Sequence, residues 1–141
     1  MSHDNGVAIV ISCSDGRLED TIARLRELLK QKSYPSLNSE TALYRIQVPG
    51  PDGILLGMRG EDHKKVLLDD IALLIEKANA TSFVFIPHCE CAGCQVSDEA
   101  HADNCVQAVD ILNQEFSLPV VSLLDKKVGD VWQLEVIAEK F

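Results

Sequence analysis

Two short stretches of the sequence carry reactive side chains at spacings that suit a metal site. The first, Cys13-Ser14-Asp15-Gly16-Arg17, places a thiol, a carboxylate and a guanidinium within five residues. The second, PHCECAGC, contains His88 and Cys91 at i, i+3, and a tight turn can aim both side chains at one point. Thiolates and imidazoles are ligands that zinc prefers, and three protein ligands leave a fourth position open, as in catalytic sites. The two stretches therefore predict one zinc ion per chain, bound by Cys13, His88 and Cys91.

Asp15 and Arg17 are the candidates to control what fills the fourth position. They flank Gly16, so an extended turn puts both side chains on one side, close enough for a bidentate ion pair. Arg17 is then expected to keep Asp15 ionised and to orient it. Asp15 can accept a hydrogen bond from a zinc-bound hydroxide, or it can rotate and become a ligand itself. The alternative interpretation is a plain ion pair at a helix start, where Asp15 caps free N–H groups.

The elements that must position these residues follow from the period of the apolar residues. Short apolar or alternating runs predict strands, and longer segments with apolar residues three or four apart predict helices. Strands are expected at residues 7–11, 41–48, 82–86, 119–125 and 131–138. Helices are expected at residues 18–32, 61–78 and 97–116. The proline- and glycine-rich residues 49–53 predict a turn, and Lys127, Val128 and Gly129 are expected to join the last two strands as a hairpin.

This alternation predicts a single α/β domain over residues 1–141. The expected fold is an open, mainly parallel sheet of strand order 2-1-3-4 with an antiparallel edge strand and helices on both faces. A chain of 141 residues suits one hydrophobic core. In this order the first and third strands are neighbours, and open α/β sheets bind ligands in the crevice at such carboxyl ends. The topology therefore brings the two reactive stretches to one crevice.

Composition and charge limit the partners and the compartment. The formal net charge is −9, whereas nucleic acids and anionic membranes require a basic face, so we expect no nucleic-acid or membrane partner, and a small-molecule substrate or a protein partner remains. No apolar run reaches the roughly 18 residues of a membrane span. The first ten residues, MSHDNGVAIV, lack the basic head and long apolar stretch of a signal peptide. A cytoplasmic location is therefore expected.

The remaining cysteines allow several interpretations. Four residues fall at i, i+4, i+7 and i+11 on one face of the expected third helix, where they form either a second metal site or a face packed on the sheet. These residues are Cys94, Asp98, His101 and Cys105. The Cys91-Ala92-Gly93-Cys94 segment can also be a redox motif at a helix N-terminus, although this leaves Cys13 and His88 without a role. The orientation of Cys89 is left open.

The paired motifs resemble those of a known family. Cys13-Ser14-Asp15-Gly16-Arg17 and His88-Cys89-Glu90-Cys91 are similar to the Cys-x-Asp-x-Arg and His-x-x-Cys motifs of the β-class carbonic anhydrases. The resemblance runs from the first core strand to the closing hairpin and implies a β-carbonic anhydrase-like fold. It implies a zinc lyase that hydrates CO2 reversibly to bicarbonate, with Cys13, His88 and Cys91 as zinc ligands and Asp15 and Arg17 as the catalytic dyad. It also implies a homodimer or a higher homo-oligomer.

The sequence departs from the family at two places. Only twelve residues precede Cys13, where the family usually has a helical arm that wraps a partner subunit. Gln47-Val48-Pro49-Gly50 stands where the family tends to have Arg-Asn-Ala-Gly. Two alternatives therefore stand beside carbonic anhydrase activity: a non-catalytic zinc-binding homologue, and a related hydrolase of carbonyl sulfide or carbon disulfide.

Overall fold

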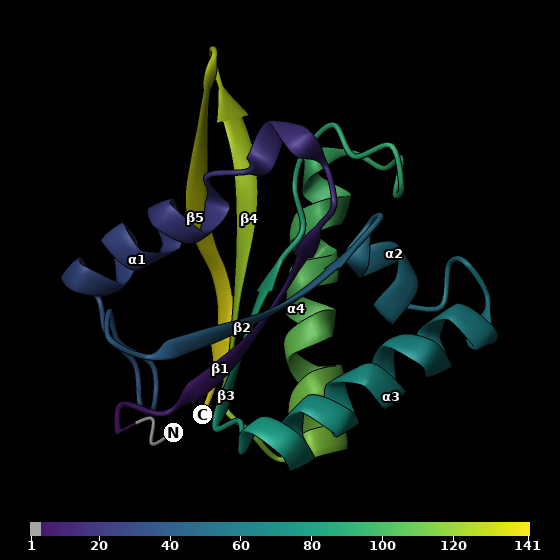
Figure 1. The fold of residues 1–141 in the computed structure, drawn as a ribbon. Coiled ribbons are helices and arrows are strands. Elements are labelled where there is room, and N and C mark those ends of the chain that lie inside the picture. Colours follow the sequence, from purple (N-terminus) through teal and green to yellow (C-terminus); the bar gives the residue numbers. More distant parts are fainter. Residues whose placement is uncertain (1–3) are drawn as a thin grey trace.

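The computed structural model describes residues 4–141 as ten elements that alternate between sheet and helix (Figure 1). The strands are β1 (Val7–Cys13), β2 (Ala42–Val48), β3 (Ser82–Ile86), β4 (Val120–Val128) and β5 (Val131–Lys140). The helices are the 3-10 helix η1 (Gly16–Leu18) and the α-helices α1 (Thr21–Gln31), α2 (Pro51–Leu55), α3 (Glu61–Ala78) and α4 (Asp98–Phe116). None of these helices combines the length and the apolar character that a membrane-spanning segment needs.

The five strands form one sheet of order β2-β1-β3-β4-β5. Strand β1 pairs in parallel with β2 and β3, β3 pairs in parallel with β4, and the last pair, β4 and β5, is antiparallel. This confirms the expected strand order and the antiparallel edge. The register aligns Cys13 with Val48 and Ser12 with Ile86, so β1, β2 and β3 end at the same edge of the sheet.

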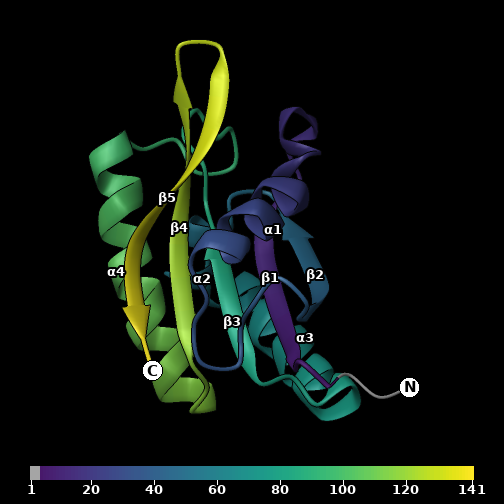
Figure 2. The ribbon, with the colours of Figure 1, turned by 90° about the vertical axis from the view of Figure 1, so that its left-hand side faces the viewer.

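Helices cover both faces of the sheet, as expected. Figure 1 shows α1 on one side and α2, α3 and α4 on the other, and Figure 2 shows α1 from the front. Alternate residues of a strand point to opposite faces. Ile9 and Ile11 accordingly pack in the core beneath α3 and α4, while Ala8 and Val10 pack against α1. Burial on both faces explains why β1 and β3 are continuously apolar.

Three boundaries differ from the sequence-based expectation. The turn expected at residues 49–53 is wrong, because Gly50 adopts a φ of 63° and Pro51 then starts the helix α2, all of whose residues are buried. The helix expected from residue 18 is divided into η1 and α1. Helix α4 begins after Ser97, whose hydroxyl accepts a hydrogen bond from the Ala100 N–H, so Cys94 precedes the helix.

The hairpin turn also lies further along the chain than expected. Strand β4 continues through Lys127 and Val128, and Gly129 and Asp130 form the turn. Gly129 has a φ of 63°, a conformation that glycine adopts without steric cost. The longer strands project the hairpin beyond the rest of the sheet (Figure 2).

A buried ion pair joins α1 to β4 close to the edge at which the parallel strands end. The guanidinium of Arg24 donates from Nη1 and Nη2 to the two carboxylate oxygens of Asp125, each at 2.7 Å. Thr21 Oγ1 donates to the same carboxylate at 3.3 Å, and Asp125 is completely buried. The backbone of Asp125 also bonds to Pro87 and Cys89. The pair therefore supports the loop that follows β3.

Candidate metal centre

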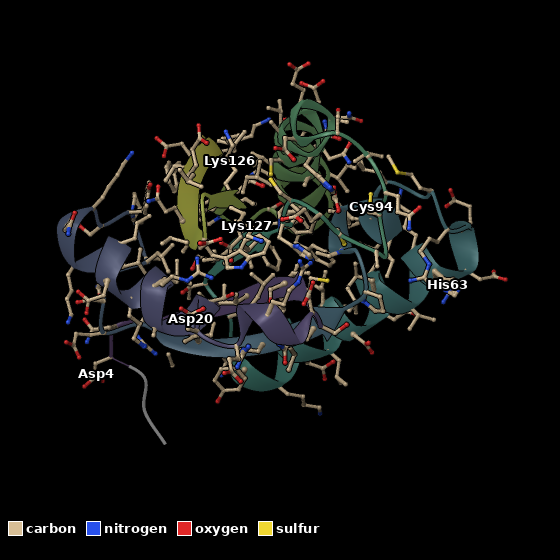
Figure 3. The ribbon with its side chains drawn as sticks, turned by 90° about the horizontal axis from the view of Figure 1, so that it is seen from above. Asp4, Asp20, His63, Cys94, Lys126 and Lys127 are labelled. Carbon is tan, nitrogen blue, oxygen red and sulfur yellow. The ribbon has the colours of Figure 1, made fainter. Side chains whose placement is uncertain are left out.

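Three potential metal ligands converge where β1 and β3 end. Cys13 is the last residue of β1, and His88 and Cys91 lie in the loop after β3. The sulfur atoms of Cys13 and Cys91 are 3.9 Å apart, and both lie within 4.8 Å of a ring nitrogen of His88. All three side chains are buried. Figure 3 shows this end of the molecule from above, with Lys127 of the hairpin near the centre of the view. The topology thus brings the two reactive stretches together.

Only one of the two ring nitrogens of His88 makes a hydrogen bond within residues 4–141. Nδ1 lies 2.6 Å from the carbonyl oxygen of Cys89, and because a carbonyl only accepts, the ring donates through Nδ1. Nε2 is buried and has no hydrogen-bond partner among residues 4–141. Most buried polar atoms in proteins have such a partner. A carbonyl that fixes the tautomer of a histidine and leaves Nε2 with a lone pair is the usual support of a metal-bound imidazole, so this residue fits a metal ligand.

The two thiols share negative charge. The hydrogen bond with Cys91 lowers the pKa of Cys13, helped by His88 and by the backbone N–H of Gly50 and opposed by burial. The same contact, together with burial, raises the pKa of Cys91, because a second thiolate beside the first is unfavourable. A divalent cation removes this conflict, because it binds both thiolates with release of the remaining proton.

Asp15 and Arg17 form a bidentate ion pair at the rim of this group. Arg17 Nη2 donates to Asp15 Oδ2 at 2.7 Å, and Nε and the backbone N–H of Arg17 also donate to the carboxylate. These hydrogen bonds from Arg17 lower the pKa of Asp15 to about 2, so the group is an acceptor. Its Oδ2 lies 3.9 Å from His88 Nε2. Asp15 also caps η1, so the ion pair and the helix-capping contact occur together.

Trp132, which the sequence left without a place, lies against the same group. Its ring meets the His88 ring edge-on with centroids 5.9 Å apart, and the Arg17 guanidinium lies 5.4 Å from its centroid. Arg17 also donates to the carbonyl of Glu90 at 3.0 Å. An open pocket of about 500 Å³ reaches Cys91 from the side of α4. The hairpin thus lies against the group on one side, and the pocket borders Cys91 on another.

Two glycines set the distance between the two loops that meet here. A Cβ atom on Gly93 would lie 2.6 Å from the carbonyl carbon of Pro49 and 2.7 Å from the nitrogen of Gly50. These are backbone atoms, so the only relief is a shift of one loop. The absence of a side chain at Gly93 therefore allows the Pro49-Gly50 segment to lie where it does, next to Cys13.

Gly93→Ala is expected to lower the free energy of unfolding by about 1–3 kcal/mol, because the added methyl group overpacks two backbones. Urea unfolding followed by circular dichroism measures the change. Gly16→Ala is the matched control, since a Cβ atom there meets nothing within 4 Å. Equal losses in both variants would contradict the close approach.

A second group of metal-ligating side chains lies between α2 and the loop before α4. Asp52, Cys94 and His101 are all buried, and their ligand atoms lie within 4.8 Å of one another. The helical spacing in the sequence places Cys94 and His101 with Asp98 and Cys105 on one helix face. That grouping is wrong, because Cys94 precedes the helix and Asp52 of α2 completes the group instead. No local pattern indicates Asp52, which lies 49 residues before its partner His101.

The other cysteines pack in the interior. Cys89 and Cys105 form a small cluster with Leu124, and burial raises the pKa of each thiol to about 12. All five cysteines are free thiols, including Cys91 and Cys94 of the Cys-x-x-Cys segment. This arrangement agrees with the packing interpretation of Cys105.

Comparison with known proteins adds one finding. A family model described as "Putative carbonic anhydrase" matches residues 3–138 of the 141 residues. No curated protein matches the chain. The matched segment holds both reactive stretches and every strand and helix except the last two residues of β5.

Proposed function

Because the chain belongs to this family of carbonic anhydrases, we propose that it is a zinc lyase that interconverts CO2 and bicarbonate. In this proposal Cys13, His88 and Cys91 hold one zinc ion, and Asp15 and Arg17 form the catalytic dyad. Zinc supplies Lewis acidity that makes a nucleophile from water near neutral pH. The observation that carries the proposal is the buried, unpartnered Nε2 of His88, among the residues described, next to two thiols 3.9 Å apart.

Each protein group has a defined task. The carbonyl of Cys89 holds the His88 ring in the tautomer that keeps Nε2 free to bind metal. Arg17 keeps Asp15 ionised and prevents it from rotating, through hydrogen bonds to both carboxylate oxygens. A fixed carboxylate at this position accepts a hydrogen bond from the nucleophile and thereby aims its lone pair at the carbon of CO2. Arg17 is itself anchored to the carbonyl of Glu90.

The proposal extends to the state of the protein in the cell. We place it in the cytoplasm, because five free cysteines and a thiolate site suit a reducing compartment. The chain acts as a single domain on a small-molecule substrate. We also propose a homo-oligomer, since β2 is an open edge of the sheet at which a second copy can join.

Asp15→Asn is expected to lower kcat for CO2 hydration by at least about 100-fold, because asparagine keeps the shape of the side chain but loses the anionic acceptor that orients the nucleophile. Zinc content should stay unchanged. Stopped-flow hydration with a pH indicator measures the rate. Asp20→Asn is the matched control, because Asp20 is also an aspartate paired with an arginine, Arg24, but its side chain is largely exposed.

The same assay distinguishes the alternatives. Zinc-loaded wild type that shows no CO2 hydration from pH 7 to 9 would contradict the proposal and favour a zinc-binding homologue without catalysis. Faster turnover of carbonyl sulfide or carbon disulfide than of CO2 would favour the related hydrolase. A wild-type rate that Asp15→Asn does not change would remove the dyad from the mechanism.

A further inference from the structure

The group formed by Asp52, Cys94 and His101 is more deeply buried than the centre described above. Asp52 and His101 are completely inaccessible to solvent, and Cys94 is buried with 6% of its surface exposed. Asp52 comes from α2 and His101 from α4. Cys94 lies in the loop between β3 and α4 (Figure 3). Three elements thus contribute one potential ligand each to one point in the interior.

The hydrogen bonds within the group use only part of its capacity. Asp52 Oδ2 accepts from His101 Nδ1 at 2.7 Å and from Asn104 Nδ2 at 2.8 Å. Asp52 Oδ1 and His101 Nε2 are both buried without a hydrogen-bond partner among residues 4–141. A carboxylate oxygen and an imidazole nitrogen left bare in the interior cost free energy unless something else satisfies them. Two such atoms in one cluster indicate a ligand.

The chemistry of the donors defines that ligand. A carboxylate oxygen, a thiol sulfur and an imidazole nitrogen form the mixed set that zinc and its neighbours in the first transition row prefer, while calcium and magnesium prefer oxygen alone. Asn104 holds the Asp52 carboxylate in place, as outer hydrogen bonds do for metal-binding carboxylates. We propose that Asp52, Cys94 and His101 form a second site for a divalent transition-metal ion, separate from Cys13, His88 and Cys91.

The second site does not depend on the proposed activity, but its residues are in contact with those of the first site. Cys94 follows Cys91 by three residues, and its side chain packs with those of Cys13 and Cys91. Gly53, next to Asp52, leaves just enough space for Cys94, whose sulfur lies 3.3 Å from the place of a Cβ atom. A cation here joins α2 to α4 at the point where α2 begins, beside the Gly50 N–H that faces Cys13.

Metal counting tests the second site directly. The full-length chain is freed of metal with a chelator, loaded separately with Zn²⁺ and with Co²⁺, and desalted, and the metal is measured by mass spectrometry. We expect two equivalents in wild type, one in Cys13→Ser, one in His101→Gln and none in the double variant. The cobalt-loaded Cys13→Ser protein should still show thiolate-to-cobalt charge-transfer absorption, and adding Cys94→Ser should remove this absorption if Cys94 is the ligand.

Matched controls keep the count interpretable. Cys105→Ser removes a buried cysteine of α4 that lies outside both groups, and this variant should retain two equivalents of metal. One equivalent in wild type, or two in His101→Gln, would overturn the proposal and leave a buried histidine–aspartate pair. If His101→Gln does not fold by circular dichroism, Cys94→Ser replaces it: one equivalent supports the second site and two equivalents refute it.

Discussion

Replacing Cys13 by serine is expected to abolish tight zinc binding at the first site and, with it, CO2 hydration. A serine hydroxyl does not ionise near neutral pH and is a poor ligand for zinc, so only His88 and Cys91 remain. Cys13 is fixed in position by the strand ladder opposite Val48. Loss of an outer hydrogen bond to a metal ligand weakens metal binding by about 10–100-fold. Loss of the ligand itself should raise the dissociation constant for zinc by more than that.

Competition with a chromophoric chelator measures that constant, and stopped-flow hydration measures the activity. Cys89→Ser is the matched control, because Cys89 is a buried cysteine of the same loop that packs against Cys105 and Leu124 instead of the metal group. It should retain both zinc and activity. Full activity in Cys13→Ser would show that this thiol is not a ligand.

Arg24→Met is expected to lower the free energy of unfolding by about 3–5 kcal/mol, the largest change in stability that we foresee. The substitution keeps much of the apolar stem of the side chain but leaves the completely buried carboxylate of Asp125 with only the Thr21 hydroxyl as a side-chain partner. An uncompensated charge in the interior costs more than the ion pair contributes. The loop that carries His88 should loosen as well, because Asp125 bonds to the backbone on both sides of it.

Urea unfolding tests this expectation with two comparisons. Lys30→Met breaks an exposed ion pair with Glu27 on the same helix and should change stability by less than about 0.5 kcal/mol. Arg24→Met combined with Asp125→Leu removes both charges and should recover part of the loss. A single Arg24→Met loss below about 1 kcal/mol would mean that the pair is of little importance.

The parts of the fold that follow from the sequence are those set by burial and topology. The apolar runs of β1 and β3 require burial on both faces, and this requirement places the two strands side by side in the middle of the sheet. Once they are neighbours, Cys13 and His88 lie at the same edge. The juxtaposition of the two reactive stretches was therefore predictable from the apolar periodicity together with the topology rules for parallel sheets.

The parts that the sequence did not reveal depend on contacts between distant residues. Pro49-Gly50-Pro51 has the composition of a turn, and only packing against α4 and the Gly93 backbone explains why a buried helix starts there. Asp52 meets His101 at a sequence separation of 49 and Trp132 reaches His88 from the hairpin, and neither spacing has a local signature. Such pairs become visible only when the chain is folded.

The position of Trp132 has one more consequence. It is the only tryptophan in the sequence, and its indole lies against the His88 ring and under the Arg17 guanidinium. The intrinsic fluorescence of tryptophan therefore originates at the rim of the candidate metal centre and nowhere else in the chain. The protein contains a built-in optical reporter of the charge and occupancy of that centre.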